Sequence, residues 1–335
     1  MAEKSDSMIQ IRGLSVEYRT PDGTVKALNG LDLELRKGKT LGLVGETGAG
    51  KTTAGLSMLR LIQEPPGVIT SGQILFRGEN LLEKSEQELE KIRGKHISMI
   101  FQDPMTALNP VFTMESQIAE SIQLHEDVTQ EQALEKARDM LELVGIPRER
   151  GREYPHQFSG GMKQRVVIAI ALACSPSVLI ADEPTTALDV TIQAQVLEMM
   201  KDLADKYQTA LLLITHDLGV VAEVCDEVSV VYAGTVVEHG TLRDVFKHTR
   251  HPYTEGLFNS LPNLDRREEK LKPIKGMMPD PSNLPEGCPF CERCNYVQPV
   301  CASKKPDKLY RTDSHYVRCH LYTDGGPEEG RLVRT

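Results

Sequence analysis

Residues 45–52, with the sequence Gly-Glu-Thr-Gly-Ala-Gly-Lys-Thr, constrain the fold more than any other stretch. An apolar run at 40–44 precedes them, and residues 53–61 have the character of a helix. A strand, a glycine-rich turn and a helix are the setting in which this pattern binds phosphate. The glycines let backbone N–H groups point at phosphate oxygens, and the helix N-terminus adds partial positive charge. We therefore expect Lys51 to reach the β- and γ-phosphates and Thr52 to bind Mg²⁺.

Composition predicts an ordinary soluble globular protein. With 335 residues, the chain is long enough for two domains, or for one large domain with an appendage. Its net charge of −9 does not suggest a general nucleic-acid surface. The longest apolar run, residues 166–174, is far shorter than the ~20 residues that span a bilayer, and residues 1–7 do not begin a secretory signal. We expect a cytosolic protein, or one attached to the cytosolic face of another component.

Alternating polarity predicts an antiparallel β subdomain near the N-terminus. Residues 8–19 and 25–35 alternate between apolar and polar side chains, with a Pro-Asp-Gly turn at 21–23 between them. This pattern indicates a hairpin that leads to the phosphate loop. Residues 68–76 add a further strand, and the polar residues 83–93 are expected to form a helix.

Short apolar runs predict a mostly parallel central sheet. Residues 97–101, 178–181 and 210–214 are such runs, and helical stretches separate them. Fully apolar strands alternating with helices are typical of an α/β fold with a buried parallel sheet. Residues 114–144 are expected to be almost wholly helical and to belong to an inserted helical subdomain at about 104–165.

The character of the sequence changes near residue 250. Prolines recur and regular periodicity disappears, so we interpret 1–249 as the main domain and 250–335 as a loop-rich C-terminal region. Cys174 and Cys225 stand alone in apolar surroundings and are expected to be buried and inert. The other five of the seven cysteines fall between 288 and 319. In a reducing compartment, such clustering favours metal or cluster binding over disulfides.

Two further stretches carry chemistry. Residues 178–183 are an apolar strand that ends in Asp182 and Glu183. Asp182 is placed to orient Mg²⁺ beside Thr52, and Glu183 to polarise an attacking water; a simple capping pair at a strand end is the alternative. Ser159 is a candidate N-cap, and Gly160 leaves backbone N–H groups free for an anion, although the stretch alone could be only a helix start.

Taken together, residues 8–245 resemble the ATP-binding subunit of an ABC transporter. The motifs occur in family order: the phosphate loop, Gln102 after a strand, Ser-Gly-Gly at 159–161, Asp-Glu at 182–183, Ala-Leu-Asp at 187–189, and His216 after another strand. Met162 departs from the pattern, because the commonest family signature has Gln there.

The resemblance implies a role for each of these residues. Tyr18 would stack on adenine; ordinary core or surface packing on its strand is the alternative. The triphosphate would be held by Gly45, Glu46, Thr47, Gly48, Ala49, Gly50, Lys51, Thr52 and Thr53. Gln102 would contact Mg²⁺ and the membrane partner, Glu183 would be the catalytic base, and His216 would sense the γ-phosphate. Ser159, Gly160 and Gly161 would complete the ATP site of a partner subunit, and Asp189 would join the dimer contact.

The resemblance narrows to the oligopeptide and dipeptide importer branch on three stretches, residues 101–110, 154–162 and 251–254. The branch implies an ATPase paired with a second, identical or paralogous ATPase chain, two membrane permeases and an extracytoplasmic substrate-binding protein. It places the chain on the cytoplasmic face of the membrane as a peripheral subunit. Nickel and some sugar importers share the branch. The rival classes are a non-transport ABC ATPase of DNA repair or translation, and an iron–sulfur or zinc regulatory module with a vestigial ATPase.

The cysteine tail suits a metal centre. Cys288, Cys291 and Cys294 are close in sequence, and Cys301 and Cys319 follow. Four thiolates suit Zn²⁺ or an iron–sulfur cluster, and unligated thiols are the remaining alternative. The importer branch implies a [4Fe-4S] cluster on Cys288, Cys294, Cys301 and Cys319, with Cys291 as a fifth thiol and alternative ligand.

Overall fold

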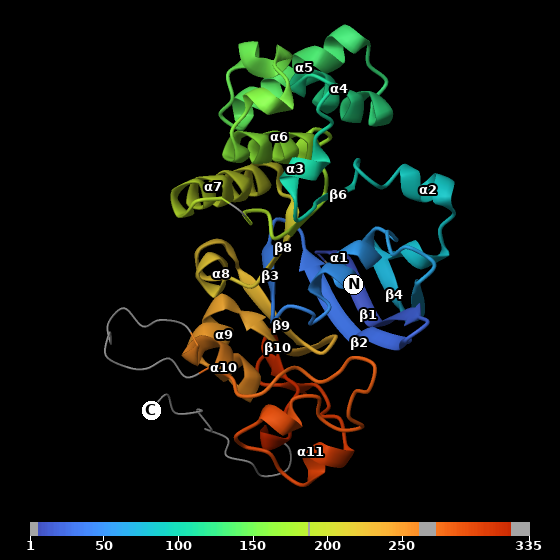
Figure 1. The fold of residues 1–335 in the computed structure, drawn as a ribbon, viewed down its shortest axis with the longest axis vertical. Coiled ribbons are helices and arrows are strands. Elements are labelled where there is room, and N and C mark those ends of the chain that lie inside the picture. Colours follow the sequence, from blue (N-terminus) through green and yellow to red (C-terminus); the bar gives the residue numbers. More distant parts are fainter. Residues whose placement is uncertain (1–5, 187, 261–272, 323–335) are drawn as a thin grey trace, which may run out of the picture.

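The computed structural model describes residues 6–186, 188–260 and 273–322. Two sheets share the centre of the molecule, and a layer of helices stands above them (Figure 1). The smaller sheet is antiparallel and has the strand order β2-β1-β4-β5. Its strands are β1 (Ser7–Thr20), β2 (Gly23–Arg36), β4 (Gly67–Phe76) and β5 (Glu79–Asn80). The predicted hairpin is therefore confirmed, with Thr20 opposite Gly23 at its turn.

The larger sheet has the order β11-β12-β10-β9-β3-β8-β7-β6. Its parallel part consists of β3 (Thr40–Val44), β6 (Ile97–Ile100), β7 (Val178–Asp182), β8 (Ala210–Thr215) and β9 (Glu227–Tyr232). Its antiparallel edge consists of β10 (Thr235–Thr241), β12 (Tyr316–Val317) and β11 (Leu309–Tyr310). The mostly parallel core is confirmed, and the last two strands come from the C-terminal region, which thus extends the same sheet.

Helices pack around this sheet and in the layer above it (Figure 1). The helices flanking the sheet are α1 (Lys51–Met58), α7 (Val190–Tyr207), α8 (Leu218–Val224), α9 (Leu242–Lys247) and α10 (Pro252–Asn259). The upper layer holds α3 (Pro104–Ala107), α4 (Met114–His125), α5 (Gln130–Leu143) and α6 (Gly160–Leu172), with the 3₁₀ turns η2 (Arg148–Arg152) and η3 (Pro155–Gln157). Short elements elsewhere are η1 (Leu81–Glu83), α2 (Glu86–Glu90), η4 (Cys291–Arg293), α11 (Val300–Ser303) and η5 (His320–Tyr322).

Two helix predictions need correction, and a third is confirmed. The helix after the phosphate loop spans Lys51–Met58 and not 53–61, because Gly50 and Arg60 adopt left-handed conformations at its two ends. The stretch 114–144 is almost wholly helical, as predicted, and consists of two helices, since Thr129 accepts the N–H of Gln132 and starts a new capped helix. The expected helix over 83–93 is only η1 and α2, where Ser85 forms a capping box.

The core is divided between the sheets and the helical layer. One buried cluster joins the upper helices to one side of the parallel strands, and Ala133, Ala137 and Leu141 belong to it, as their helical spacing predicts. A second cluster joins the antiparallel sheet to α1 and β3. The phosphate loop lies where β3 meets α1, beside the second cluster. Within the described segments, no helix combines the length and the apolar character needed to cross a membrane.

Candidate nucleotide site

The phosphate loop joins β3 to α1, as its pattern predicts, and two of its glycines are required by space. A Cβ atom on Gly45 would stand 2.3 Å from the carbonyl oxygen of Val231. One on Gly50 would stand 2.5 Å from the carbonyl oxygen of Ala27, and Gly50 has a φ of 99°. Side chains other than that of glycine rarely adopt this conformation. The loop can therefore pack against the neighbouring backbone only with glycine at these two positions.

Lys51 folds back over the loop. Its Nζ donates to the carbonyl oxygen of Gly45 at 2.8 Å and to that of Glu46 at 3.0 Å. The residue is only 7% exposed. Burial lowers the pKa of Lys51, although the carboxylates of Glu183 and Asp182 oppose this shift. An ammonium group with so little water around it interacts strongly with an anion placed on the loop.

Two of the three residues predicted to hold Mg²⁺, Thr52 and Asp182, lie together. Asp182 ends β7 and is 2% exposed. Burial raises the pKa of Asp182, while a hydrogen bond from the Thr52 hydroxyl lowers it. A hydroxyl and a carboxylate are the hard oxygen donors that Mg²⁺ prefers. These donors fit the metal, and Thr52 stands at the start of α1, where the phosphates of a bound nucleotide would lie.

Gln102 and His216, which follow two different strands, both contact the carboxylate of Glu183 at the end of a third strand. Gln102 follows β6, Glu183 follows β7 and His216 follows β8. The Nε2 of Gln102 donates to Glu183 Oε2 at 3.1 Å, and the Nδ1 of His216 lies 2.9 Å from Glu183 Oε1. The hydroxyl of Thr186 donates to Oε2 at 3.1 Å. Parallel strands bring their carboxyl ends to one edge of the sheet, and this edge faces Lys51.

The surroundings of Glu183 keep it ionised. Burial alone would raise its pKa, but the hydrogen bond and charge of His216 and the hydrogen bond of Thr186 hold the pKa below its usual value. The backbone of Glu183 has a φ of 46°, a strained value for a residue with a side chain. An ionised carboxylate held at a fixed angle is suited to accept a proton from water.

The remaining residues predicted to hold nucleotide lie around the same loop. Thr47 and Gly48 form its exposed tip, while Ala49 is fully buried. Tyr18, on β1, has its hydroxyl 3.4 Å from the Thr53 hydroxyl of α1. The tyrosine therefore reaches the side of the phosphate site, and its stacking on adenine stays a prediction.

The signature residues lie elsewhere. Ser159 is exposed and caps α6, where its Oγ accepts the N–H of Met162 at 3.4 Å. Gly160 is also exposed, and a Cβ on Gly161 would stand 2.6 Å from Cγ2 of Ile192 in α7. Figure 1 shows α6 in the helical layer, away from α1. The chain thus presents its signature outward and not to its own phosphate loop.

Asp189 is exposed beside this signature surface. Its carboxylate accepts the N–H of Ile192 at 3.0 Å and caps α7. The motif that contains it begins at Ala187, which lies outside the described residues. The capping role explains the acidic residue locally, and its part in a dimer contact stays a prediction.

Sequence reasoning missed two residues that contact the phosphate loop. Arg293 donates to both carboxylate oxygens of Glu46, at 2.7 and 2.9 Å. The hydroxyl of Tyr253 accepts the N–H of Glu46 at 2.8 Å. Tyr253 lies in the stretch 251–254 that marked the importer branch, which was the only signal available. Nothing in the sequence around Arg293 connects it with a loop 247 residues away.

The five tail cysteines gather in one region. Cys288 donates its N–H to the carbonyl oxygen of Cys301 at 2.8 Å. Burial raises the pKa of Cys288 to about 11 and that of Cys319 to about 12, and neighbouring cysteines add to both shifts. All are free thiols, and burial also raises the pKa of Cys291 and Cys294. Across the part of the chain that the structure describes, no three His, Cys, Asp or Glu side chains are placed to hold a metal ion together.

The two solitary cysteines differ in burial. Cys225 is buried, and burial raises its pKa to about 12, as expected of an inert thiol. Cys174 is only partly buried, so the expectation of full burial is wrong for it. Its Sγ donates to the carbonyl oxygen of Ser121.

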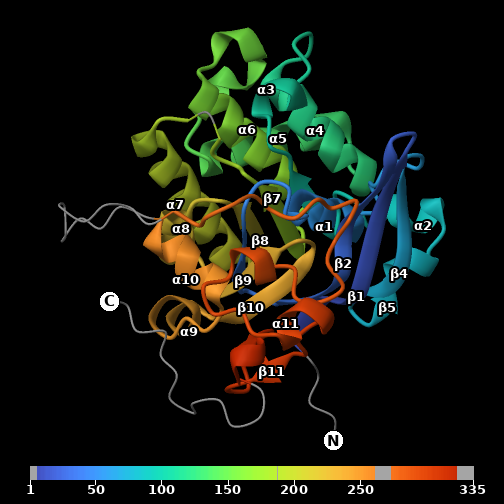
Figure 2. The same ribbon diagram turned by 60° about the horizontal axis from the view of Figure 1, so that its bottom comes forward.

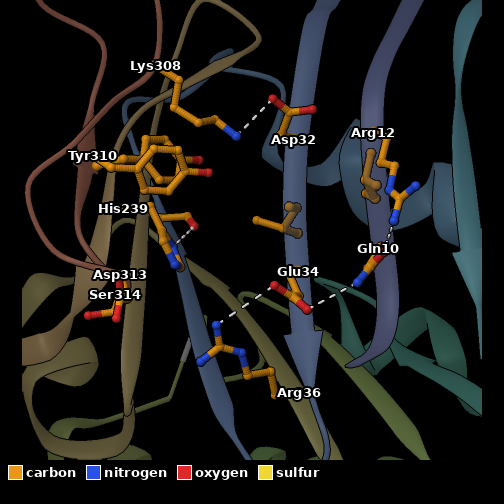
Figure 3. Close-up of a pocket in the computed structure, with 14 residues that line it drawn as sticks. Gln10, Arg12, Asp32, Glu34, Arg36, His239, Lys308, Tyr310, Asp313 and Ser314 are labelled. Carbon is orange, nitrogen blue, oxygen red and sulfur yellow. Dashed lines mark hydrogen bonds and ion pairs between the residues drawn. The ribbon is translucent and has the colours of Figure 1, made fainter. Parts of the chain in front are cut away.

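A polar cavity of about 290 Å³ lies between the antiparallel sheet and the C-terminal region (Figure 3). Several of its polar side chains are paired with one another. Lys308 points at Asp32 across the cavity, 3.1 Å from its Oδ2, and Gln10 donates to Glu34 at 3.2 Å. The cavity therefore marks where the C-terminal region docks on β2, at a distance from the phosphate loop in the fold.

Two family descriptions match the chain. "ABC transporter" matches residues 28–186, and "Oligopeptide/dipeptide transporter, C-terminal region" matches residues 237–301. The oligopeptide transport ATP-binding protein OppD of Bacillus subtilis is 48% identical over 324 residues, which are 96% of this chain and 90% of the relative. The dipeptide transport ATP-binding protein DppD of the same organism is 48% identical over 94% of this chain and 95% of the relative.

A solved structure has the same fold. It is a dimeric ATP-binding cassette in a post-hydrolysis state, bound to ADP and Pi. It matches with a TM-score of 0.63 at 25% identity and covers 70% of this chain and 99% of its own.

Proposed function

We propose that this chain, which belongs to the ATP-binding subunits of ABC transporters in the oligopeptide and dipeptide importer branch, hydrolyses ATP to energise the import of di- and oligopeptides. Its family makes it an ATPase. The observation that carries the proposal is the meeting of Gln102, Glu183 and His216 at strand ends that face Lys51. The printed descriptions of its relatives support peptides as the solute.

The residues of this chain divide the hydrolytic work. The loop backbone and Lys51 bind the β- and γ-phosphates and balance the charge that develops during transfer. Glu183 accepts the proton of the attacking water, while Gln102 and His216 hold its carboxylate in place. Thr52, Asp182 and Gln102 are the residues that would hold Mg²⁺, which neutralises phosphate charge when bound. Tyr18 orients the base of the nucleotide.

A complete ATP site requires a second ATPase subunit. The exposed Ser159 cap and the N–H groups of Gly160 and Gly161 form an anion-binding helix start that faces away from the chain's own loop. In the proposal they contact the γ-phosphate held by the partner, and Asp189 lies in the same contact. The dimeric cassette of the same fold supports this arrangement.

The remaining partners follow from the branch. They are two integral permeases and an extracytoplasmic binding protein, with this subunit peripheral on the cytoplasmic face of the membrane. Closure and opening of the ATPase dimer would move the permeases. A nickel or other small-solute importer is the alternative, because it would use the same ATPase.

The C-terminal cysteines are proposed to hold a [4Fe-4S] cluster on Cys288, Cys294, Cys301 and Cys319, with Cys291 as the alternative ligand. The number and type of the thiols, and not their present placement, support this proposal, and Cys294 and Cys301 each accept a backbone N–H at sulfur, at 3.3 and 3.5 Å. Such bonds orient and tune cluster thiolates. Bound there, the cluster would cross-link the loop-rich tail. Protein purified without oxygen should contain about four irons per chain; colourless protein with stoichiometric zinc would contradict the cluster.

Transport itself tests the main proposal. The chain is assembled in proteoliposomes with the two permeases and the binding protein of a peptide importer, and uptake of labelled dipeptide, oligopeptide and Ni²⁺ is compared. ATP-dependent peptide uptake without Ni²⁺ uptake is the expected result. Uptake of Ni²⁺ alone would show that the solute is nickel and not peptide, and ATP hydrolysis with no uptake of any of these solutes would contradict the proposed import.

A further inference from the structure

Glu46, the second residue of the phosphate loop, is held from the C-terminal region. Arg293 at the end of η4 forms a two-point ion pair with it, from Nη1 to Oε2 at 2.7 Å and from Nη2 to Oε1 at 2.9 Å. The Arg293 side chain is only 6% exposed. The Glu46 side chain is 31% exposed. A bidentate guanidinium–carboxylate pair whose guanidinium is buried is stronger and more directional than an ion pair between two exposed side chains.

The guanidinium of Arg293 is itself fixed by its surroundings. Its Nε donates to the carbonyl oxygen of Lys275 at 3.1 Å, and its Nη1 also donates to the hydroxyl of Tyr232 at 3.3 Å. The rings of Tyr232 and Phe290 lie 5.8 and 5.9 Å from its central carbon. The arginine therefore has one well-defined position, and that position determines where the Glu46 carboxylate lies.

A second contact fixes the backbone of the same loop residue. The N–H of Glu46 donates to the hydroxyl of Tyr253, which is fully buried in α10. The ring of Tyr253 packs against that of Tyr232, with centroids 4.6 Å apart. Glu46 is thus held through both its main chain and its side chain by one aromatic cluster that also holds Arg293.

The segment before η4 runs beside the loop. The N–H of Lys26 on β2 donates to the carbonyl oxygen of Pro281 at 3.0 Å. A Cβ on Gly48 would stand 3.9 Å from Cε of Met278. Figure 2 shows the chain crossing from the side of α10 to β2 before it turns toward α11. The C-terminal region therefore borders the phosphate loop along several residues.

Charge gives the ion pair a consequence for nucleotide binding. Glu46 places a negatively charged carboxylate in the loop that would bind the negatively charged phosphates. An unpaired carboxylate there would repel the nucleotide and weaken its binding. Arg293 neutralises that carboxylate. The carbonyl oxygen of Glu46 also accepts one of the two Lys51 hydrogen bonds, so the position of Glu46 affects where the lysine ammonium stands.

We propose that Arg293 is a positioning residue of the ATP site, which neutralises and orients Glu46 so that the phosphate loop binds the triphosphate. The C-terminal region is then a working part of the nucleotide site. This inference rests on the assignment of residues 45–53 to ATP. Arg293 does not touch the nucleotide; it acts through Glu46.

The test measures MgATP affinity and steady-state hydrolysis of the full chain and five variants. Arg293→Ala should weaken MgATP binding and raise KM by about tenfold, with kcat changed by less than about threefold, because uniform binding is lost. Glu46→Gln in the Arg293→Ala background should bring the affinity back to within about threefold of the parent, since the unpaired charge is gone. The MgATP affinity of Arg293→Lys should lie between those of the parent and Arg293→Ala, because lysine keeps the positive charge but cannot form the two-point contact.

Lys308→Ala is the matched control, because Lys308 also joins the C-terminal region to the main domain, through Asp32 (Figure 3). It should bind MgATP like the parent. The proposal is overturned if Arg293→Ala binds like the parent, if Glu46→Gln fails to restore it, or if Lys308→Ala weakens binding equally. If Arg293→Ala does not fold, Arg293→Lys decides: parent-like affinity in that variant overturns the proposal. Lys51→Ala tests the ATP site independently of Arg293. Unchanged nucleotide binding in that variant would refute the assignment of residues 45–53 to ATP.

Discussion

The carboxylate cluster at the strand ends and the signature at the start of α6 differ in how complete they are. Glu183 already has hydrogen bonds from Gln102, Thr186 and His216 within one chain. Ser159 is exposed, and the described hydrogen bond of its side chain is to the N–H of Met162 in the helix that it caps. The first is a preorganised site, and the second is an exposed surface that we propose contacts the nucleotide held by a partner subunit. Hydrolysis should therefore depend on residues of one chain for its chemistry and on a second chain for its assembly.

The largest loss of hydrolysis should come from a change in the carboxylate cluster around Glu183. Glu183→Gln removes the proton acceptor while keeping the shape, so kcat should fall by about 10²- to 10⁴-fold. ATP binding should persist, because the loop and Lys51 are untouched. Single-turnover hydrolysis and equilibrium nucleotide binding measure the two effects. Hydrolysis at the parent rate would show that another group is the base.

A smaller loss should come from the signature side. Ser159→Arg places a bulky cation at the helix start, and kcat should fall by about a hundredfold through loss of the partner's anion contacts. Arg152→Ala, an exposed position in the same layer, is the control and should hydrolyse normally. In a dimer of two copies, co-assembly of Ser159→Arg with Glu183→Gln chains should restore one intact site. Failure of mixed dimers to regain activity, where self-dimers form, would argue that the signature acts within its own chain.

The pH profile tests the electrostatics of the cluster. The pKa of Glu183 is held below its usual value by His216 and Thr186, so the base stays ionised until the pH falls through that lowered pKa. His216→Ala removes one cause, and the acid limb of kcat should move to higher pH. Thr186→Ala should move it in the same direction by less. An unmoved limb in both variants would mean that the limb reports a different group.

The smallest effect should come from the scaffold of the signature. Thr129→Ala removes the cap of α5 in the helical layer and should lower the free energy of unfolding by about 1 kcal/mol. Hydrolysis should stay within about twofold of the parent, because α5 supports the signature only indirectly. Thermal unfolding and steady-state rates provide the check. A loss of activity as large as that of Ser159→Arg would mean that α5 affects hydrolysis directly and does not only stabilise the helical layer.

The sequence by itself determined the fold class and the positions of the main site residues. The phosphate loop and the Asp182–Glu183 strand end were predicted because each depends on its local backbone: a turn that requires glycine, or a strand that ends in polar residues. The alternating hairpin of β1 and β2 was predicted for the same reason. His216 was predicted only from the order of motifs that the chain shares with its family. Helix ends were less predictable, since the left-handed conformations of Gly50 and Arg60 placed the ends of α1 at Lys51 and Met58 and not at 53 and 61.

Tertiary structure alone decided which distant residues meet. The pairing of β12 with β10 carries the C-terminal region onto the central sheet, and the packing of Tyr232, Tyr253 and Phe290 brings Arg293 to Glu46. Arginine, tyrosine and glutamate are ordinary residues with no local pattern of their own. Their meaning lies in contacts across 247 positions of chain, which only the folded core can establish.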